Sequence, residues 1–132
     1  MNHAHFDRAR DVLFLRTSGF WDVEEARSFL QQVTRLCAQS KAIGRRLSVL
    51  SNVSGLVPQI AEVVALQGEG FAILREADIA RYILVIPSAM SRVRFRRALA
   101  PVVPEFFDNA AEALTAAGYT RSDIPAFWLE EA

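Results

Sequence analysis

Runs of apolar residues divide the chain into segments with two different spacings. Short, nearly continuous apolar runs bounded by glycine, proline or charged residues are typical of strands in a sheet that is covered on both faces. The expected strands are residues 3–9, 12–17, 47–53 and 82–86, with a short last one at Phe106-Phe107. The first two are separated by Arg10-Asp11, a tight turn that predicts an opening hairpin.

Between these strands, apolar residues recur every three or four positions, which is the spacing of one helix face. Asp22 with Glu25 three residues later forms a capping-box pattern. Ser88 is a good cap for a second helix, and Asp108 is expected to cap the last one. These helices are expected over residues 22–44, 88–100 and 110–117.

One further helix is expected over residues 59–76, after a break in the chain at Ser54-Gly55 and Pro58. Its apolar arc is wider than one sheet face needs, which predicts that the helix is covered on two sides. Gly68 and Gly70 weaken its middle, because each costs about 1 kcal/mol relative to alanine in a helix interior. We therefore expect a kink or a break there.

Strands and helices alternate along the second half of the chain, which predicts an α/β fold with a mixed sheet of about five strands. The opening hairpin supplies the antiparallel part of this sheet. A length of 132 residues and an apolar fraction of 52% fit one domain over residues 1–132. The last apolar segment, residues 124–129, is expected to pack on the body of the protein or on a partner chain.

Charge and targeting signals exclude several functional classes. Fifteen basic residues balance fifteen acidic ones, so a uniformly basic nucleic-acid-binding surface is not expected. The first ten residues are polar and lack the apolar core of a secretory signal. No apolar run approaches the roughly 20 residues of a membrane span. We therefore expect a soluble cytoplasmic protein with no integral membrane association.

Catalytic and cofactor chemistry finds little support in the residues. His3 and His5 are the only histidines, and because no third ligand lies near them we expect exposed terminal histidines and no metal site. Cys37 falls on the apolar face of its helix, where a small core residue is expected in place of a nucleophile. No glycine-rich phosphate loop follows a predicted strand. The prediction is a non-enzymatic protein without a cofactor.

The helix that begins at Ser88 carries several arginines and forms the strongest candidate binding site. A helix N-terminus attracts anions, and Ser88, Ser91 and Arg92 would line this one. Arg92 and Arg96 share a side of the helix, so the candidate ligand is a phosphate or a lipid head group. The alternative is that these arginines are solvated and that their stems cover apolar surface.

Three stretches resemble the signature stretches of the SpoIIAA-like proteins, small STAS-type domains that are also similar to the CRAL-TRIO lipid-binding fold. These stretches are residues 47–59 (LSVLSNVSGLVPQ), 88–99 (SAMSRVRFRRAL) and 107–114 (FDNAAEAL). The order of elements agrees over nearly the whole chain. The resemblance implies a four- or five-stranded sheet with helices mainly on one side. It also implies frequent dimerisation and a regulatory or small-ligand-binding role in place of catalysis.

The resemblance also implies two regulatory positions. Ser54 is similar to the phosphorylatable serine of bacterial anti-sigma-factor antagonists, although Pro58 intervenes before the helix in this chain. Asn52 stands where members usually carry an aspartate at the end of the central strand, so this chain lacks the carboxylate of the family pattern. In the arginine-rich helix, Arg94 replaces the glutamine of the family pattern and makes the helix more basic.

The leading prediction is a bacterial, STAS-type regulatory module that acts through protein contacts as a homodimer. The wide apolar arc of the 59–76 helix and the sequence of residues 127–129 (FWL) motivate the dimer, because exposed apolar patches usually mark contacts. The alternative is a carrier or sensor of a small apolar or amphiphilic, lipid-like ligand. That ligand would occupy a pocket between the same helix and the sheet, with Arg92 or a helix terminus at one end.

Overall fold

A five-stranded mixed sheet forms the centre of the computed structural model, which describes residues 2–129. The strands are β1 (Asn2–Asp7), β2 (Val12–Gly19), β3 (Leu47–Leu56), β4 (Ile79–Val85) and β5 (Glu105–Phe107), in that order across the sheet. β1 and β2 are antiparallel, and the other neighbouring strands are parallel. This is the mixed α/β fold that the alternation of elements predicts.

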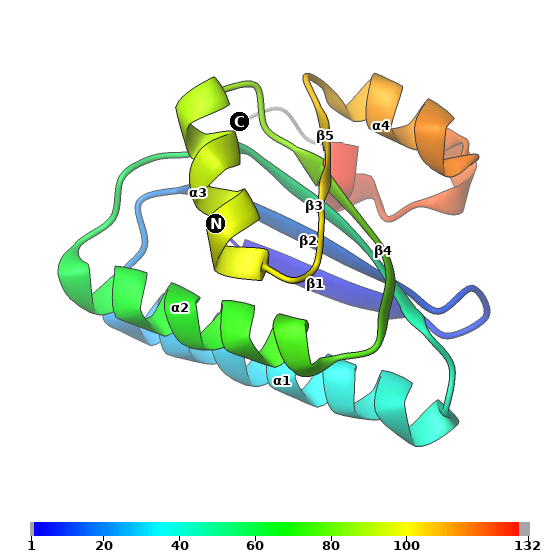
Figure 1. The fold of residues 1–132 in the computed structure, drawn as a ribbon, viewed down its shortest axis with the longest axis horizontal. Helices are drawn as coiled ribbons and strands as arrows, with labels where there is room; N and C mark the ends of the chain where they lie inside the picture. The colour runs from blue at the N-terminus through cyan, green and yellow to red at the C-terminus, as the bar shows by residue number, and fades with distance from the viewer. Residues whose placement is uncertain (1, 130–132) are drawn as a thin grey trace.

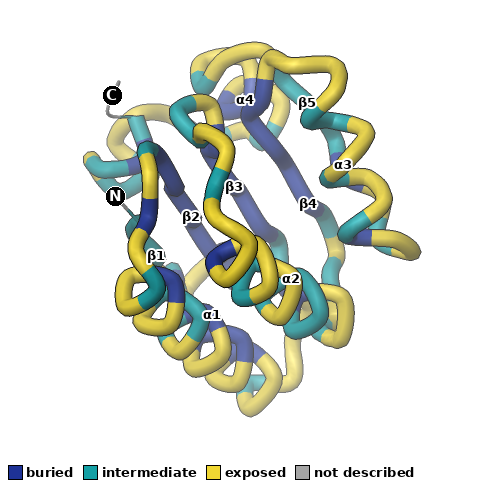
Figure 2. The backbone as a smooth tube through the Cα atoms, turned by 90° about the vertical axis from the view of Figure 1, so that its left-hand side faces the viewer, coloured by how far each residue is buried: buried dark blue, intermediate teal, exposed yellow. Residues whose placement is uncertain are grey.

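Three helices cover one face of the sheet, and a fourth covers the other (Figures 1 and 2). The first face carries α1 (Val23–Ile43), α2 (Ala61–Glu76) and α3 (Ala89–Leu99). The second carries α4 (Ala110–Ala117) and the short helical turns η1 (Arg121–Asp123) and η2 (Ala126–Leu129). The expectation of helices mainly on one side is confirmed. None of the helices within residues 2–129 combines the length and the apolar character needed to cross a bilayer.

The sheet separates two hydrophobic clusters because successive strand residues point to opposite faces. On β2, Leu13 and Leu15 join the cluster beneath α1, α2 and α3, whereas Val12 and Phe14 join the cluster beneath α4 and η2. Phe14 is completely buried. The apolar run at residues 12–17 therefore supplies both sides of the molecule, as a strand covered on both faces requires.

The opening hairpin differs from its prediction. β1 ends at Asp7, and the turn takes the four residues 8–11. Asp7 Oδ1 accepts hydrogen bonds from the backbone N–H groups of Ala9 at 3.1 Å and Arg10 at 3.3 Å. Asp11 has a left-handed φ of 55°, a conformation that aspartate adopts more readily than most residues. Bonds from the Asp7 side chain to the backbone thus end the strand earlier than the residue pattern indicates.

The predicted break at Ser54-Gly55 is wrong, because β3 continues through it to Leu56. After a register shift, Ser18 of β2 lies opposite Gly55, and Gly19 lies opposite Leu56. The neighbouring parallel strand therefore holds this segment extended despite its turn-forming residues.

α2 begins at Ala61, two residues later than expected, and no side chain caps its first turn. It stays helical through Gly68 and Gly70, so the break proposed there is also wrong. Packing against α1 supports this stretch, since a Cβ placed on Gly70 would lie 3.8 Å from Leu30 Cδ1.

Capping signals locate two helix starts correctly and one incorrectly. Asp22 Oδ1 accepts a hydrogen bond from Glu25 N at 2.8 Å, and Ser88 Oγ accepts one from Ser91 N at 3.3 Å. The last helix is capped by Asn109, not by Asp108. The Asp108 carboxylate is instead held by Arg92, whose Nη2 lies 2.7 Å from Asp108 Oδ1.

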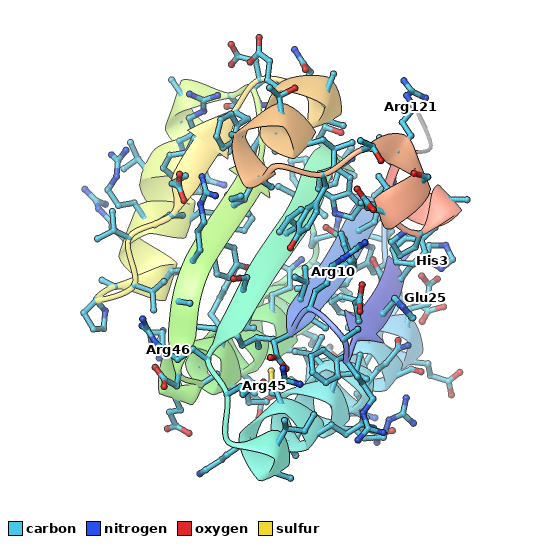
Figure 3. All side chains as sticks on the ribbon, turned by 90° about the vertical axis from the view of Figure 1, so that its right-hand side faces the viewer. His3, Arg10, Glu25, Arg45, Arg46 and Arg121 are labelled. Carbon is cyan, nitrogen blue, oxygen red and sulfur yellow. The ribbon has the colours of Figure 1, made fainter. Side chains whose placement is uncertain are left out.

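The apolar segment near the C-terminus packs on the body of this chain. Trp128 is completely buried against the second face of the sheet, and its ring meets Phe14 edge-on at a centroid separation of 6.4 Å. Phe127 stacks on His3 of β1 at 5.1 Å, and Figure 3 shows His3 beside this segment. Of the two observations that motivated a homodimer, the tail therefore no longer supplies an exposed surface.

Candidate functional site

A cavity of about 480 Å³ lies between the first face of the sheet and helices α1, α2 and α3. We call it the interhelical cavity. Its floor is formed by residues of the three central strands, its walls by apolar residues of the helices. The floor includes Leu15, Thr17, Ser51, Val53 and Tyr82. The walls include Phe29, Val33, Phe71, Leu74, Phe95 and Ala98. A cavity of this size and apolar character is typical of small-molecule sites.

The few polar groups of the floor are buried, and some of them have no hydrogen-bond partner within residues 2–129. Tyr82 is buried and forms a side-chain hydrogen bond with Ser51. Burial raises the pKa of the Tyr82 hydroxyl, so this group is neutral at physiological pH. Two further lining residues carry buried polar atoms without a hydrogen-bond partner in the described part of the chain, Thr17 Oγ1 and Trp21 Nε1. The floor thus offers neutral polar groups and no charge.

One end of the cavity is held in shape by Gln59, which joins the loop after β2 to the loop after β3. Gln59 Oε1 accepts a hydrogen bond from Trp21 N at 2.8 Å. Gln59 Nε2 donates to Gly19 O at 2.8 Å and to Val57 O at 2.7 Å. The backbone on both sides of Phe20 is therefore fixed, and the Phe20 ring is left 60% exposed. Figure 1 shows both loops at the end of the sheet where α1 and α2 begin.

Exposed apolar side chains gather around this end, which we call the mouth. Each of them lines the cavity or lies directly beside a residue that does. They are Phe20, Val57, Ile60, Val64, Met90 and Val93, which are 42–71% exposed. Within residues 2–129, the only other large apolar side chain with such exposure is Val103. The mouth is therefore the main exposed apolar surface of the described chain.

α3 turns one face toward the cavity. Ser91, Arg94, Phe95 and Ala98 line it, at the three- and four-residue spacing of one helix face. Phe95 meets Phe71 of α2 edge-on at a centroid separation of 5.4 Å, which closes part of the gap between the two helices. Arg94 is exposed and is the only charged residue that lines the cavity among residues 2–129.

The other arginines proposed for this helix lie elsewhere. Arg92 donates from Nε to Ile86 O at 2.8 Å and from Nη2 to Asp108 Oδ1 at 2.7 Å. The guanidinium groups of Arg92 and Arg96 both lie over the Phe106 ring, at 5.5 Å and 5.2 Å from its centroid. Of the four proposed ligand-binding residues, Ser88 caps the helix and Ser91 lines the cavity. The structure does not bring Arg92 and Arg96 to that cavity.

The two positions on β3 that the sequence indicated, Asn52 and Ser54, belong to a set of hydrogen bonds that holds the C-terminal segment. We call this set the bracket. Asn52 Nδ2 donates to Trp128 O at 2.8 Å, and Arg16 Nη1 donates to the same oxygen at 3.3 Å. Asn52 Oδ1 accepts from Ser54 N at 3.2 Å and from Ser54 Oγ at 2.8 Å. An aspartate at position 52 would present only acceptors to the Trp128 carbonyl when ionised. The amide is therefore the group that this bracket needs.

The residues considered for catalysis lie away from the cavity. Cys37 is packed in the core of the first face, and burial raises the pKa of its thiol to about 11. The thiol is therefore protonated at neutral pH and is not an activated nucleophile. His5 is exposed on β1, and no group of three or more metal-ligating side chains occurs within residues 2–129.

The overall arrangement matches a known fold. A solved structure described as the anti-sigma factor antagonist SpoIIAA in its unphosphorylated form superposes with a TM-score of 0.57. The match covers 89% of this chain and 97% of that one. The fold is that of SpoIIAA. At 18% identity the likeness is one of fold alone, and it confirms the SpoIIAA-like, STAS-type architecture that the three sequence stretches indicate. No protein-family profile and no curated protein matches the chain.

The sequence did not identify three of the residues that line the cavity in this SpoIIAA-like fold. Gln59, Trp21 and Arg94 come from three different segments, and only the fold brings them to one cavity. The wide apolar arc of α2 and its two glycines were the available signal. Gly68 and Gly70 both line the cavity, and a Cβ placed on Gly68 would have no atom within 4 Å.

Proposed function

We propose that this protein is a non-enzymatic, STAS-type binding module that holds a small apolar or amphiphilic ligand in the interhelical cavity. The observation that carries the proposal is the cavity itself, about 480 Å³ between the sheet and α1, α2 and α3. Protein interiors leave few voids larger than a water molecule. The second face of the same sheet is closed by Trp128, which is completely buried. An apolar cavity with a few polar groups in its lining is the default candidate for a ligand-binding site.

The lining supports binding in place of catalysis. No histidine, cysteine or carboxylate within residues 2–129 lines the cavity, so its serine and threonine hydroxyls have no general base of these kinds beside them to activate them as nucleophiles. The walls are mostly aliphatic and aromatic. Burial of a ligand's apolar surface there is worth roughly 25 cal/mol per Å² before the costs of association.

The first experiment is a native mass spectrum of the protein as purified, followed by titration with phenyl-naphthylamine, a neutral dye that fluoresces in apolar sites. We expect either a small-molecule adduct or saturable dye binding. Gly68→Leu places a side chain in the gap between α2 and α3, because Gly68 lies on the helix face of Val64 and Phe71. This variant should abolish dye binding.

Ala65→Leu is the matched control, since Ala65 is exposed on the same helix and does not line the cavity. It should bind dye as the unchanged protein does. Ala98→Leu plugs the cavity from α3 and provides a second variant. Absence of both adduct and saturable dye binding, or equal binding by the plugged and control variants, would refute the cavity as a ligand site.

A regulatory module that acts through protein contacts is the second candidate. It is favoured by the exposed apolar residues of the mouth, Phe20 and Met90 above all, and by the SpoIIAA-like fold. Such a surface fits a homodimer or a protein partner. We expect a concentration-dependent dimer in light scattering that Phe20→Ser with Met90→Ser disrupts. A monomer at high micromolar concentration would argue against self-association.

A further inference from the structure

We propose that the ligand of the interhelical cavity is a single-chain amphiphile with an anionic head group, and that Arg94, exposed on the α3 wall of the cavity, binds this head group. The inference rests on the proposed function, because it requires the cavity to be a ligand site. It names what that function leaves open, which is the charge of the ligand and the end at which the charge lies.

The sign of the charge follows from the lining. Arg94 is the only charged residue that lines the cavity within residues 2–129, and no carboxylate lines it. A cationic head group would find no partner there and would be repelled by Arg94, whereas an anionic one would find a guanidinium that can donate two parallel hydrogen bonds.

Arg94 is also the one arginine that both lines the cavity and has no partner within residues 2–129. Arg92 is held by Asp108 and the Ile86 carbonyl. Arg75 donates from Nη1 to Ala98 O at 2.6 Å, and Arg96 lies over the Phe106 ring at 5.2 Å. Arg94 has no hydrogen-bond or ion-pair partner within residues 2–129, and its side chain is exposed at the cavity wall.

The acidic residues at the helix starts near the mouth belong to α1 and α2. Asp22 caps α1, Glu24 and Glu25 lie in its first turn, and Glu62 lies in the first turn of α2. None of them lines the cavity. α3 itself carries four arginines and no acidic residue over Ala89–Leu99. The potential along the α3 wall is therefore positive, and it guides an anion to Arg94 in preference to the opposite wall.

The end of the ligand that carries the charge follows from the lining of the cavity interior. The deep walls are apolar, formed by side chains such as Val33, Leu74 and Phe71, and the polar atoms of Ser51 and Tyr82 bond to each other. A carboxylate or phosphate placed among these groups would lose its hydration without gaining a counter-charge. The ligand is therefore polar at one end only, with the apolar chain inside and the head group at the exposed Arg94.

Competition against bound phenyl-naphthylamine tests this inference with dodecanoate and dodecanol, ligands of equal chain length that differ in head-group charge. The unchanged protein should bind dodecanoate more tightly. Arg94→Gln should weaken dodecanoate binding about 5- to 10-fold, the range for loss of one partly exposed charged contact, and should leave dodecanol binding unchanged. Arg97→Gln is the matched control, because Arg97 is exposed on α3 and does not line the cavity.

The outcomes separate the two proposals. If Gly68→Leu abolishes the binding of both ligands, but the unchanged protein does not prefer dodecanoate or Arg94→Gln behaves as Arg97→Gln does, the cavity is a ligand site and the anionic assignment is wrong. If neither ligand binds, or if Gly68→Leu leaves their binding intact, the proposed function itself fails and the anionic assignment falls with it.

Discussion

The two faces of the central sheet are built from the same strands, yet they are closed to different degrees. On the second face Trp128 is completely buried, its Nε1 donates to Leu50 O at 2.9 Å, and its carbonyl accepts from Asn52 and Arg16. On the first face three helices leave a cavity of about 480 Å³. Figure 2 shows the buried strands between these two layers.

This difference shows how one sheet can combine a tightly packed face with a face that leaves a cavity. Every polar atom of Trp128 that faces the sheet has a partner, whereas Trp21 on the cavity side keeps a buried Nε1 without one in the described chain. Satisfied buried groups fix a single arrangement, and unsatisfied ones mark the places where packing is incomplete. The closed face therefore holds the strands in place, and the open face keeps the space in which we propose that a ligand binds.

The largest effect should come from opening the closed face. Trp128→Ala removes a fully buried indole and its hydrogen bond to Leu50 O, and we expect a loss of about 3–5 kcal/mol in the free energy of unfolding. Urea denaturation measures this loss. Val103→Ala, at a side chain that is 77% exposed, is the control and should change stability by less than about 0.5 kcal/mol. Equal stability of the two variants would contradict the comparison.

A smaller loss should follow from breaking the bracket around the C-terminal segment. Asn52→Ala removes the amide that donates to Trp128 O at 2.8 Å and leaves that carbonyl with the longer bond from Arg16. We expect a loss of about 1–3 kcal/mol in the free energy of unfolding. Ser54→Ala removes only the exposed partner of Asn52 and should cost less. A larger loss in the free energy of unfolding for Ser54→Ala than for Asn52→Ala would contradict this assignment of hydrogen bonds.

The smallest effect, and the only gain, should come from filling the open face. Gly68→Leu replaces a glycine in a helix interior, where a Cβ meets no atom within 4 Å. We expect the free energy of unfolding to rise by about 1 kcal/mol, because leucine favours the helix more than glycine does. Thermal unfolding of the ligand-free protein measures it. A loss of stability would mean that the gap between α2 and α3 is already filled.

Much of the fold could be predicted from local signals in the sequence. Asp22 and Ser88 cap the helices that follow them, and the apolar run at residues 82–86 lies in and just after β4. These signals act within a few residues, so the pattern alone carries them. The predicted break at Ser54-Gly55 failed because pairing with β2, a distant segment, overrides the preference of those residues for turns. The cap assigned to Asp108 failed because Arg92 holds its carboxylate.

The candidate site was harder to predict than the fold. The sequence indicated a pocket between α2 and the sheet, and the cavity lies there. It did not indicate which arginine lines that cavity, because helical spacing groups Arg92 with Arg96 but does not say which side faces the sheet. The partners that settle this question are Phe106 and Asp108, which follow α3 in the chain and draw Arg92 away from the cavity wall.

The long sequence separation between Trp128 and the strand that it covers has a consequence for synthesis in the cell. The Trp128 indole bonds to Leu50, 78 residues earlier in the chain, and a ribosome makes the chain from the N-terminus. The part of the second face that Trp128 covers therefore stays open until residue 128 has left the ribosome, and contacts of such long sequence separation form slowly. The closed face is thus completed later in synthesis than the strands that it covers.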